Sequence, residues 1–523
     1  MPIKPTYPGI YIEELPSNSH TIVAAPTSIT VFIGYAHPFK SGWKDDADTL
    51  HVDEVFSFSE YERKFGGFFS SGWIFSYLPN AVNQFFLNGG SIAYIVGLRP
   101  KYLPSGIVKP LTVAGSKPIS FTVREPVDLT PMTVSISPNG DQTLADITIA
   151  YGLSAETFRG VSLDPTKPRF INTVIGTADK PVSSLVTVSP SGASYPAKFV
   201  ATPDKVVLSG GVPGGTTFAY SALDFIAAFK EEGLLDKVSI FNLMALPGIV
   251  ENSVLSEALA FCERKRAFLV VDPPFDAGTD STSTLPIYDV KTATGKVTSQ
   301  IIPLSTNGAL YFPYLKSTDP VTNTPTEIPP SGFVAGIYSK TDQNRGVWKA
   351  PAGLETTILN TTGVADRGQM NDMQQGKLNQ VAVNCLRSFP GNGTVVFGAR
   401  TLVGNDDNPT FQQWRYVPVR RMALFIEQTL YNNLKWVIFE PNDEPLWIAI
   451  RTSIERFLLS LYRQGAFQGS TPSHAFQVKC DHTTTTQTDI DNGIVNIIVA
   501  FAPLKPAEFV VVKIAQLAGQ VQA

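Results

Sequence analysis

The sequence predicts a multi-domain protein of mixed α/β class, with mixed-sheet core domains, an inserted β-rich domain and an extended β-arm at each end. Strand and helix patterns alternate with short connections in residues 26–100 and 207–405. Residues 101–206 are instead rich in Ser, Thr, Pro and Val and show strand patterns without a helical period. The chain has 523 residues, which is enough for about three or four domains.

The first predicted element is a strand within residues 1–25, a linker arm. In "TYPGIYIEELP" Ile10 and Ile12 fall on one face and Tyr11 and Glu13 on the other. No Asn-Gly or Asp-Gly turn follows to fold this strand back as a hairpin. We therefore expect it to lack a partner nearby in its own chain. Its residues are Gly9, Ile10, Tyr11, Ile12, Glu13, Glu14 and Leu15.

The α/β core is predicted in two parts that flank the insert. Residues 26–100 contain "SITVFIGYA", "SYLPNAVNQFFLNGG" and "SIAYIVGL", a strand, a helix and a strand. Residues 207–405 contain two helices that alternate with "VSIFNLMAL" and "AFLVVD", as in right-handed βαβ crossovers. Within this part, residues 274–330 are predicted to be a Ser/Thr/Pro-rich excursion. The stretch "PPSGFVAGIYSKTDQNRGVWKAPAG" is interpreted as turns around short structured pieces.

Residues 406–523 are predicted to form a C-terminal domain that ends in the second β-arm. Two helices, "VRRMALFIEQTLYNNLKWVIF" and "NDEPLWIAIRTSIERFLLSLYRQGAF", should pack together, with Asn442 or Asp443 capping the second. An apolar stripe at helical spacing supports this, formed by Trp447, Ile450, Ile454, Phe457 and Leu461. Two strands follow, "GIVNIIVAFAPLKP" and "EFVVVKIAQLAGQ". The second is apolar on both faces and so requires neighbours in a sheet; it contains Phe509, Val510, Val511, Val512, Lys513 and Ile514.

Composition excludes several functional classes. Hydrophobic residues make up 43% of the chain and charged residues 16%, which favours an ordered protein whose surface is partly buried by assembly. A net charge of -4 argues against a partner of nucleic acid. No apolar run is long enough to span a membrane, and no secretory signal pattern opens the chain. The odd number of cysteines favours reduced, buried thiols at Cys262, Cys385 and Cys480.

Motifs that carry chemistry are weak or absent. "GGVPGGTT" has the spacing of a phosphate loop, but Thr216 stands where the lysine is needed, so a structural glycine turn is favoured. In "DHTTTTQTD", Asp481, His482 and Asp489 could bind a cation, although a solvated turn is the favoured interpretation. The acidic pairs Asp406/Asp407 and Asp443/Glu444 are interpreted as a loop and a helix start. We expect no enzymatic activity, no catalytic residue, no metal and no cofactor.

Several long segments resemble the tail sheath proteins of contractile phage tails and related contractile injection systems. They include "YPGIYIEELPSNSHTIVAAPTSITVFIG", "LSGG", "VFGARTL", "WRYVPVRRMALFIEQTL" and "FEPNDEPLWIAIRTSIERFLLSLYRQGAFQG", together with the Gly- and Pro-containing stretch quoted above. The resemblance covers about residues 6–100 and 205–520. A capsid-like or surface-layer polymer is the alternative, but a surface-layer protein would need an export signal. A nucleotide-dependent enzyme would need the lysine that position 216 lacks.

The resemblance implies that both arms pair with sheets of neighbouring copies. It further implies stacked rings in a six-fold helical array around an inner tube protein, with baseplate and tail-terminator proteins as further partners. Assembly would take place in the bacterial cytoplasm, as part of a phage tail, a cytoplasmic or membrane-anchored injection system, or a released extracellular particle. The tube contact of the family lies in the C-terminal domain, where the candidates are Arg451, Arg456 and Arg463; a solvated helix face is the alternative for these arginines.

Overall fold

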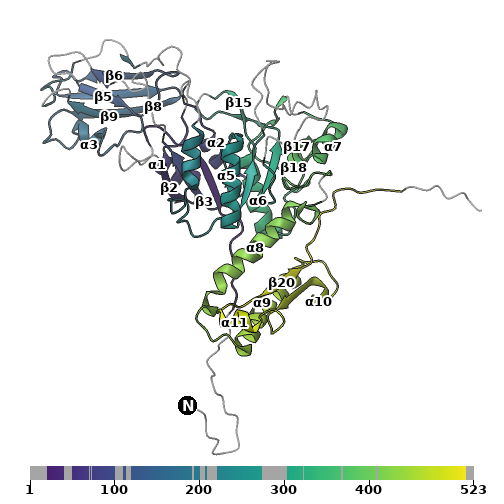
Figure 1. Ribbon diagram of the computed structural model, residues 1–523. Helices are drawn as coiled ribbons and strands as arrows, with labels where there is room; N and C mark the ends of the chain where they lie inside the picture. The colour runs from purple at the N-terminus through teal and green to yellow at the C-terminus, as the bar shows by residue number, and fades with distance from the viewer. Residues whose placement is uncertain are drawn as a thin grey trace, which may run out of the picture. The chain divides into compact units, whose positions relative to one another are not determined.

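The computed structural model describes most of the chain and confirms the mixed α/β class (Figure 1). The described residues are 21–40, 50–69, 71, 74–99, 110–112, 119–190, 194–200, 206–208, 221–273, 303–321, 323–366, 369–407 and 410–513. They form two compact units. The sheet unit comprises Thr27–Asn344 and Pro351–Val417, and the C-terminal unit comprises the chain up to Pro26, Arg345–Ala350 and the chain from Pro418. No helix among the described residues is long and apolar enough to cross a bilayer.

The sheet unit is built on an eight-stranded sheet with the order β18-β17-β13-β12-β11-β1-β3-β2. Its six inner strands run parallel, and the edge strands β2 and β18 are antiparallel to their neighbours. The strands are β1 (Thr30–Tyr35), β2 (Leu50–Val55), β3 (Ala93–Leu98), β11 (Leu243–Ala245), β12 (Phe268–Val271), β13 (Gly308–Phe312), β17 (Val383–Phe389) and β18 (Gly393–Phe397). Every residue of β1 is buried, as expected for a parallel strand covered on both faces.

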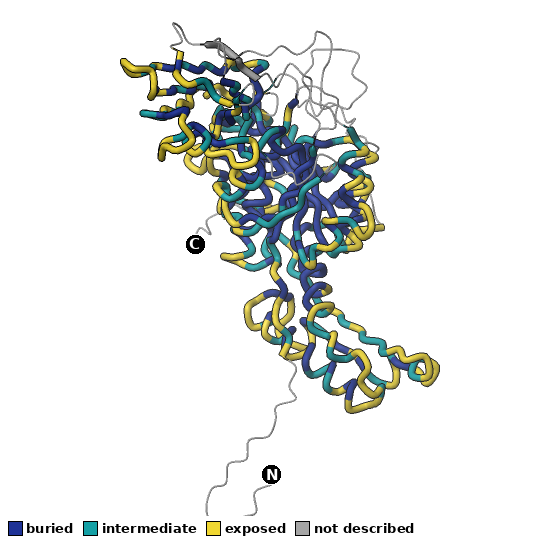
Figure 2. The backbone as a smooth tube through the Cα atoms, turned by 90° about the vertical axis from the view of Figure 1, so that its left-hand side faces the viewer, coloured by how far each residue is buried: buried dark blue, intermediate teal, exposed yellow. Residues whose placement is uncertain are grey.

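Helices cover both faces of this sheet. In β1, Val31 and Ile33 belong to one apolar cluster and Phe32 to the other, so alternate side chains enter different layers. One layer contains α1 (Phe58–Phe65), α2 (Leu78–Leu87) and α6 (Ser331–Arg345). The other contains α4 (Ala222–Ile226), the short helix η1 (Ala227–Phe229), α5 (Asn252–Lys265) and α7 (Asp372–Gln380). In Figure 2 the buried residues, drawn in dark blue, are concentrated in this sheet and its covering helices.

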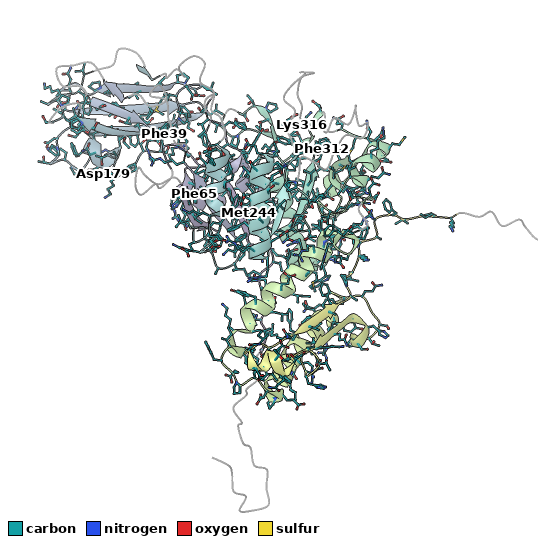
Figure 3. All side chains as sticks on the ribbon, viewed as in Figure 1. Phe39, Phe65, Asp179, Met244, Phe312 and Lys316 are labelled. Carbon is teal, nitrogen blue, oxygen red and sulfur yellow. The ribbon has the colours of Figure 1, made fainter. Side chains whose placement is uncertain are left out.

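The three cysteines are free and buried, as predicted. The sulfur of Cys262 in α5 lies 3.9 Å from that of Met244, which belongs to the inner strand β11 of the sheet (Figure 3). These thiols therefore belong to apolar cores.

The predicted β-rich insert folds around its own apolar cluster. One of its sheets has three strands, β4 (Pro110–Thr112), β5 (Ile119–Val123) and β9 (Val186–Pro190). The other has four, β6 (Met132–Pro138), β7 (Leu144–Tyr151), β8 (Ser154–Ser162) and β10 (Val206–Leu208), and α3 (Ile171–Val174) lies between β8 and β9 in the sequence. Since β10 pairs with β6, the strand in "KVVL" belongs to the insert and not to the core sheet.

Two sequence interpretations need correction. The stretch "PPSGFVAGIYSK", interpreted as turns, forms the 15-residue helix α6, whose first nine residues are all buried. Part of the predicted 274–330 excursion belongs to the core, because β13 lies between β12 and β17. It is followed by a three-stranded sheet of β14 (Leu315–Thr318), β15 (Pro325–Ile328) and β16 (Gly363–Val364). The strand β13 was missed because it is short and ends next to Pro313, so its residues show no clear strand period in the sequence.

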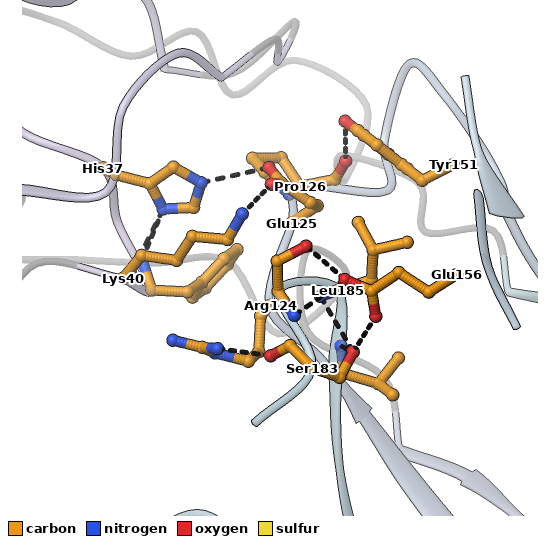
Figure 4. Close-up of polar contacts among 12 residues, drawn as sticks. His37, Lys40, Arg124, Glu125, Pro126, Tyr151, Glu156, Ser183 and Leu185 are labelled. Atoms are coloured by element: carbon orange, nitrogen blue, oxygen red, sulfur yellow. Dashed lines mark hydrogen bonds and ion pairs between the residues drawn. The ribbon is translucent and has the colours of Figure 1, made fainter. Parts of the chain in front are cut away.

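A buried polar cluster joins the insert to the core sheet (Figure 4). His37 directly follows the β1 region and is fully buried. Its Nδ1 accepts from the backbone N–H groups of Phe39 and Lys40, both at 3.2 Å. Its Nε2 therefore carries the proton and donates to Glu125 of the insert at 3.0 Å. Lys40 binds the second carboxylate oxygen of Glu125, and a cavity of about 620 Å³ opens beside the cluster.

The C-terminal unit packs two helices against a small sheet. It contains α8 (Val417–Asn433), η4 (Lys435–Val437), α9 (Glu444–Arg463), α10 (Pro472–Ala475), β19 (Phe476–Lys479), α11 (Gln487–Asp491) and β20 (Ile498–Phe501), while η3 (Gln412–Trp414) precedes it in the sheet unit. The predicted apolar stripe of α9 is buried throughout. Asp443 is the N-cap, accepting from the Leu446 N–H at 3.3 Å.

Candidate inter-subunit surfaces

The C-terminal arm shows an unusual run of exposed apolar side chains. Residues 509–513 belong to no strand within the chain, and Ile514 lies outside the described residues. The exposed fractions are 72% for Phe509, 82% for Val510, 80% for Val511 and 75% for Val512. Adjacent apolar residues exposed to this extent are typical of surfaces that another molecule covers.

The sheet of the C-terminal unit has only two strands, β19 and β20, and both of its edges are unpaired within the described chain. In their antiparallel register Phe476 lies opposite Phe501 and Lys479 opposite Ile498. The Ala502 N–H donates to the Ala475 carbonyl at 2.8 Å, which fixes the alternation of hydrogen-bonded and non-hydrogen-bonded pairs. The backbone groups of Val499 and Phe501 therefore point away from β19, and those of Phe476 and Val478 away from β20.

The two faces of this sheet differ in character. The side chains of Phe476, Val478, Val499 and Phe501 pack into the apolar cluster formed with α8 and α9. Those of Gln477, Lys479, Ile498 and Ala500 are exposed. An added strand with apolar residues on one face would extend the packed layer. Isolated two-stranded sheets are marginal in stability, so this sheet is suited to accept further strands.

The N-terminal arm, Gly9–Leu15, lies outside the described residues, as do Ser17–His20. The chain that follows is tied to α8 by side-chain hydrogen bonds. Asn433 accepts from the Val23 N–H at 2.9 Å and donates to the Val23 carbonyl at 2.8 Å. Thr429 accepts from the Ala25 N–H at 3.1 Å. These contacts fix the root of the arm, and no local pattern indicated Asn433, because its partner is 410 residues away in the sequence.

The three candidate tube-contacting arginines do not share one face of α9. Arg456 and Arg463 are exposed and about two helical turns apart, so they lie on the same side. Arg451 is half-buried on another side. It lies near Cys480, where burial raises the pKa of the thiol and the charge of Arg451 opposes that rise. The structure thus brings two of the three arginines together.

The acidic motifs have structural roles. Asp481 accepts from the backbone N–H of Thr483 at 2.8 Å, and Asp489 forms a capping box with Thr486 at the start of α11. Among the described residues no three ligating side chains gather as in a metal site. Asp406 pairs with Arg400, which is 1% exposed, at 3.0 Å. The glycine-rich loop Gly210–Thr217 lies outside the described residues.

Comparison with known protein families identifies the chain. Its residues 220–402 match the phage tail sheath protein central domain, and residues 410–516 match the phage tail sheath C-terminal domain. Together these two matches span more than half of the chain. The chain belongs to the phage tail sheath family. The resemblance stated from the sequence is confirmed, and the family is one of structural proteins.

Individual relatives are distant. The tail sheath protein of Vibrio phage KVP40 is 27% identical over 184 residues, which is 35% of this chain but only 25% of that protein. A prophage major tail sheath protein of Pseudomonas aeruginosa is 24% identical over 53% of this chain and 66% of the relative. Among solved structures, the contracted PVC sheath complex of an extracellular contractile injection system covers 98% of each chain, with a TM-score of 0.57 and 22% identity. That structure supports the fold.

Proposed function

We propose that this sheath-family protein is the structural subunit of a contractile sheath. Copies polymerise as stacked rings around an inner tube, and contraction drives the tube through a target envelope. The observation that carries the proposal is the combination, in one unit, of a two-stranded sheet with both edges open and an exposed apolar arm. This combination supports a strand-exchange contact in which each chain is both donor and acceptor.

The link between subunits is addition of arm strands to the sheet of a neighbour. Backbone hydrogen bonds supply the affinity, and alternate side chains enter the apolar layer. The donors are Gly9–Leu15 and Phe509–Ile514, and the acceptors are the outer edges of β19 and β20. Thr21 is exposed, and Pro503 forms an isolated bridge with Phe467. The proposed hinges of the two arms are Ser17–Thr21 and Pro503–Pro506.

Contraction uses conformational energy. The extended and contracted lattices bury different surfaces, and a small difference per subunit, summed over many copies, drives the change without nucleotide hydrolysis. The inner tube, baseplate and tail-terminator proteins are the further partners. Assembly takes place in the bacterial cytoplasm, as part of a phage tail, an injection system or a released particle. Arg451, Arg456 and Arg463 are the proposed tube contacts. Arg456 and Arg463 are exposed on one side of α9, whereas Arg451 is half-buried on another side.

The test is negative-stain electron microscopy of the purified, untagged protein at high concentration. Hollow striated cylinders are the expected result. Val499→Pro removes an N–H that points away from β19, so it should block strand addition while leaving β19 paired. Val499→Ala loses comparable packing but keeps the N–H and serves as the matched control.

The expected outcome is cylinders for the wild type and Val499→Ala, and dispersed particles with an unchanged far-UV circular dichroism spectrum for Val499→Pro. Cylinders of normal length from Val499→Pro would contradict strand addition at the edge of β20.

A further inference from the structure

The cavity beside the His37 cluster lies where the insert meets the core of the sheet unit. Its volume of about 620 Å³ is in the range of pockets that hold small molecules. The core contributes Lys40, the C-terminal end of α1 and the loop Pro320–Val321, and the insert contributes Arg124, Glu125 and the turn between β7 and β8. A molecule bound in this cavity would therefore contact insert and core together.

The charges that line the cavity leave one cation over. Glu62 and Arg63 of α1 are both exposed, so water screens them and their opposite charges cancel. Lys40 forms an ion pair with Glu125. Arg124 remains as the excess positive charge of the lining.

The surroundings of Arg124 compensate its charge only in part. The guanidinium is half-buried, and its Nη1 donates to the Ser183 carbonyl at 2.6 Å (Figure 4). Glu156 attracts it from a distance but accepts instead from the hydroxyls of Ser183 and Ser184, both at 2.5 Å. Burial lowers the pKa of Arg124, and the charges of Glu125 and Glu156 offset this only partly. Since a guanidinium has five N–H donors, this one is suited to bind an anion.

Much of the remaining wall of the cavity is apolar. Its side chains are Phe68, Leu153, Leu185, Pro320 and Val321. Leu153 is 77% exposed, so it marks the opening, whereas Leu185 is buried. A cationic group beside an apolar wall matches a ligand with an anionic head and an apolar body.

We propose that the cavity binds a small organic anion, whose phosphate or carboxylate group pairs with Arg124 and whose apolar part contacts Phe68, Leu153 and Leu185. The bound molecule stabilises the junction between insert and core. Every residue of this site lies in the sheet unit. The site therefore goes beyond the proposed function and depends neither on strand addition nor on contraction.

The ligand class is tested by calorimetric titration of the unassembled full-length protein at low ionic strength. The probes are phenyl phosphate and benzoate, and benzyl alcohol is the uncharged control with the same ring. At least one anion should bind tenfold more tightly than benzyl alcohol and raise the thermal unfolding midpoint. If neither anion binds at millimolar concentration, or if benzyl alcohol binds as tightly, the proposal is wrong.

The role of the guanidinium is tested by Arg124→Gln. The matched control is Arg159→Gln, which removes an exposed arginine of β8, in the insert, that does not line the cavity. Arg124→Gln should weaken binding of the anion at least tenfold, and Arg159→Gln should change it less than twofold. Equal effects of the two variants would show that the anion is attracted by the general charge of the insert and would overturn the site.

A second pair of variants probes the opening without touching a buried residue. Because Leu153 is exposed, Leu153→Glu and Leu153→Gln should both unfold at the wild-type temperature. The glutamate places a negative charge at the opening, so Leu153→Glu should bind the anion at least threefold more weakly than Leu153→Gln. Equal affinities of these two variants would contradict binding in this cavity.

The chain itself offers a competing anion. Asp45, Asp46 and Asp48 follow Lys40 in the sequence and lie outside the described residues. A variant with all three aspartates replaced by asparagine should bind the anion with the wild-type affinity. If the anion binds this variant and not the wild type, the carboxylates of the chain occupy the cavity and the proposal of a separate ligand is wrong.

Discussion

At the residue scale, His37 controls the stability of the junction between insert and core. Burial lowers the pKa of His37 below 6.5, and the hydrogen bond to Glu125 offsets this only in part, while Lys40 and Arg124 lower it further. The buried imidazole is therefore neutral in the folded state and takes up a proton near pH 6.5 on unfolding. Its contribution to stability is fully present above that pH and is lost as the pH falls below it.

The prediction concerns the pH dependence of unfolding. Between pH 7.5 and 5.5 the wild-type free energy of unfolding should decrease, by at most about 1.4 kcal/mol per pH unit from one proton. His37→Gln retains a side-chain N–H but has no titration in this range, so its decrease should be smaller. Urea unfolding at a series of pH values measures both proteins. Parallel pH profiles would show that His37 is not the titrating group.

The polar partner of His37 also illustrates what sequence patterns leave undetected. Glu125 is 88 residues further along the chain, in the insert. Nothing in the spacing of a histidine at a strand end and a glutamate in a distant β-rich segment indicates that the two side chains meet. Their pairing is a property of the tertiary fold.

At the element scale, α6 depends on two glycines that let it approach α2 closely. A Cβ at Gly332 would lie 2.4 Å from the Ala81 carbonyl oxygen, and one at Gly336 would lie 2.7 Å from that of Phe85. These contacts are with backbone atoms of α2 and cannot be relieved by side-chain rotation. The same glycines explain why the sequence indicated turns here, since glycine spacing marks loops and close helix packing alike.

We predict opposite effects of Gly→Ala substitution in two helices. Gly332→Ala should destabilise the protein by about 1–3 kcal/mol, because overpacking outweighs the gain in helix propensity. Gly376→Ala, in α7, meets nothing within 4 Å and should be neutral or stabilise by up to about 1 kcal/mol. Urea unfolding midpoints compare the two. A stabilising Gly332→Ala would mean that α2 and α6 are not in close contact.

Elements with a clear period were predicted well from the sequence. A short apolar run marked β1, whose residues are all buried, and the apolar stripe marked α9 together with its cap at Asp443. Elements whose period is hidden were not: α6 is buried on nearly all sides, and β13 is short and ends beside a proline. The open edges of β19 and β20 were also not predicted. The sequence of a strand does not show which other strands lie beside it, so an unpaired edge becomes visible only in the folded sheet.

At the scale of the whole molecule, the proposed contact between copies is heterologous. The arm of one copy and the sheet edge of another are different surfaces, so each copy offers both a donor and an acceptor. Contacts of this kind generate open, helical assemblies when the rotation does not close into a ring. A chain that keeps its acceptor edges but lacks one donor arm should therefore join a growing assembly on one side only.

Deletion of residues 1–20 provides such a chain. The root of the arm remains attached through the Asn433 bonds to Val23, so the truncated protein should unfold at the wild-type temperature. Alone, it should fail to form cylinders. Mixed with the wild type as a minor component, it should shorten the cylinders in proportion to its mole fraction, as measured by electron microscopy. Mixtures whose cylinders keep their length, although the truncated chain is incorporated, would mean that the N-terminal arm is not a required link. Assembly would then depend on the C-terminal arm and the body contacts alone.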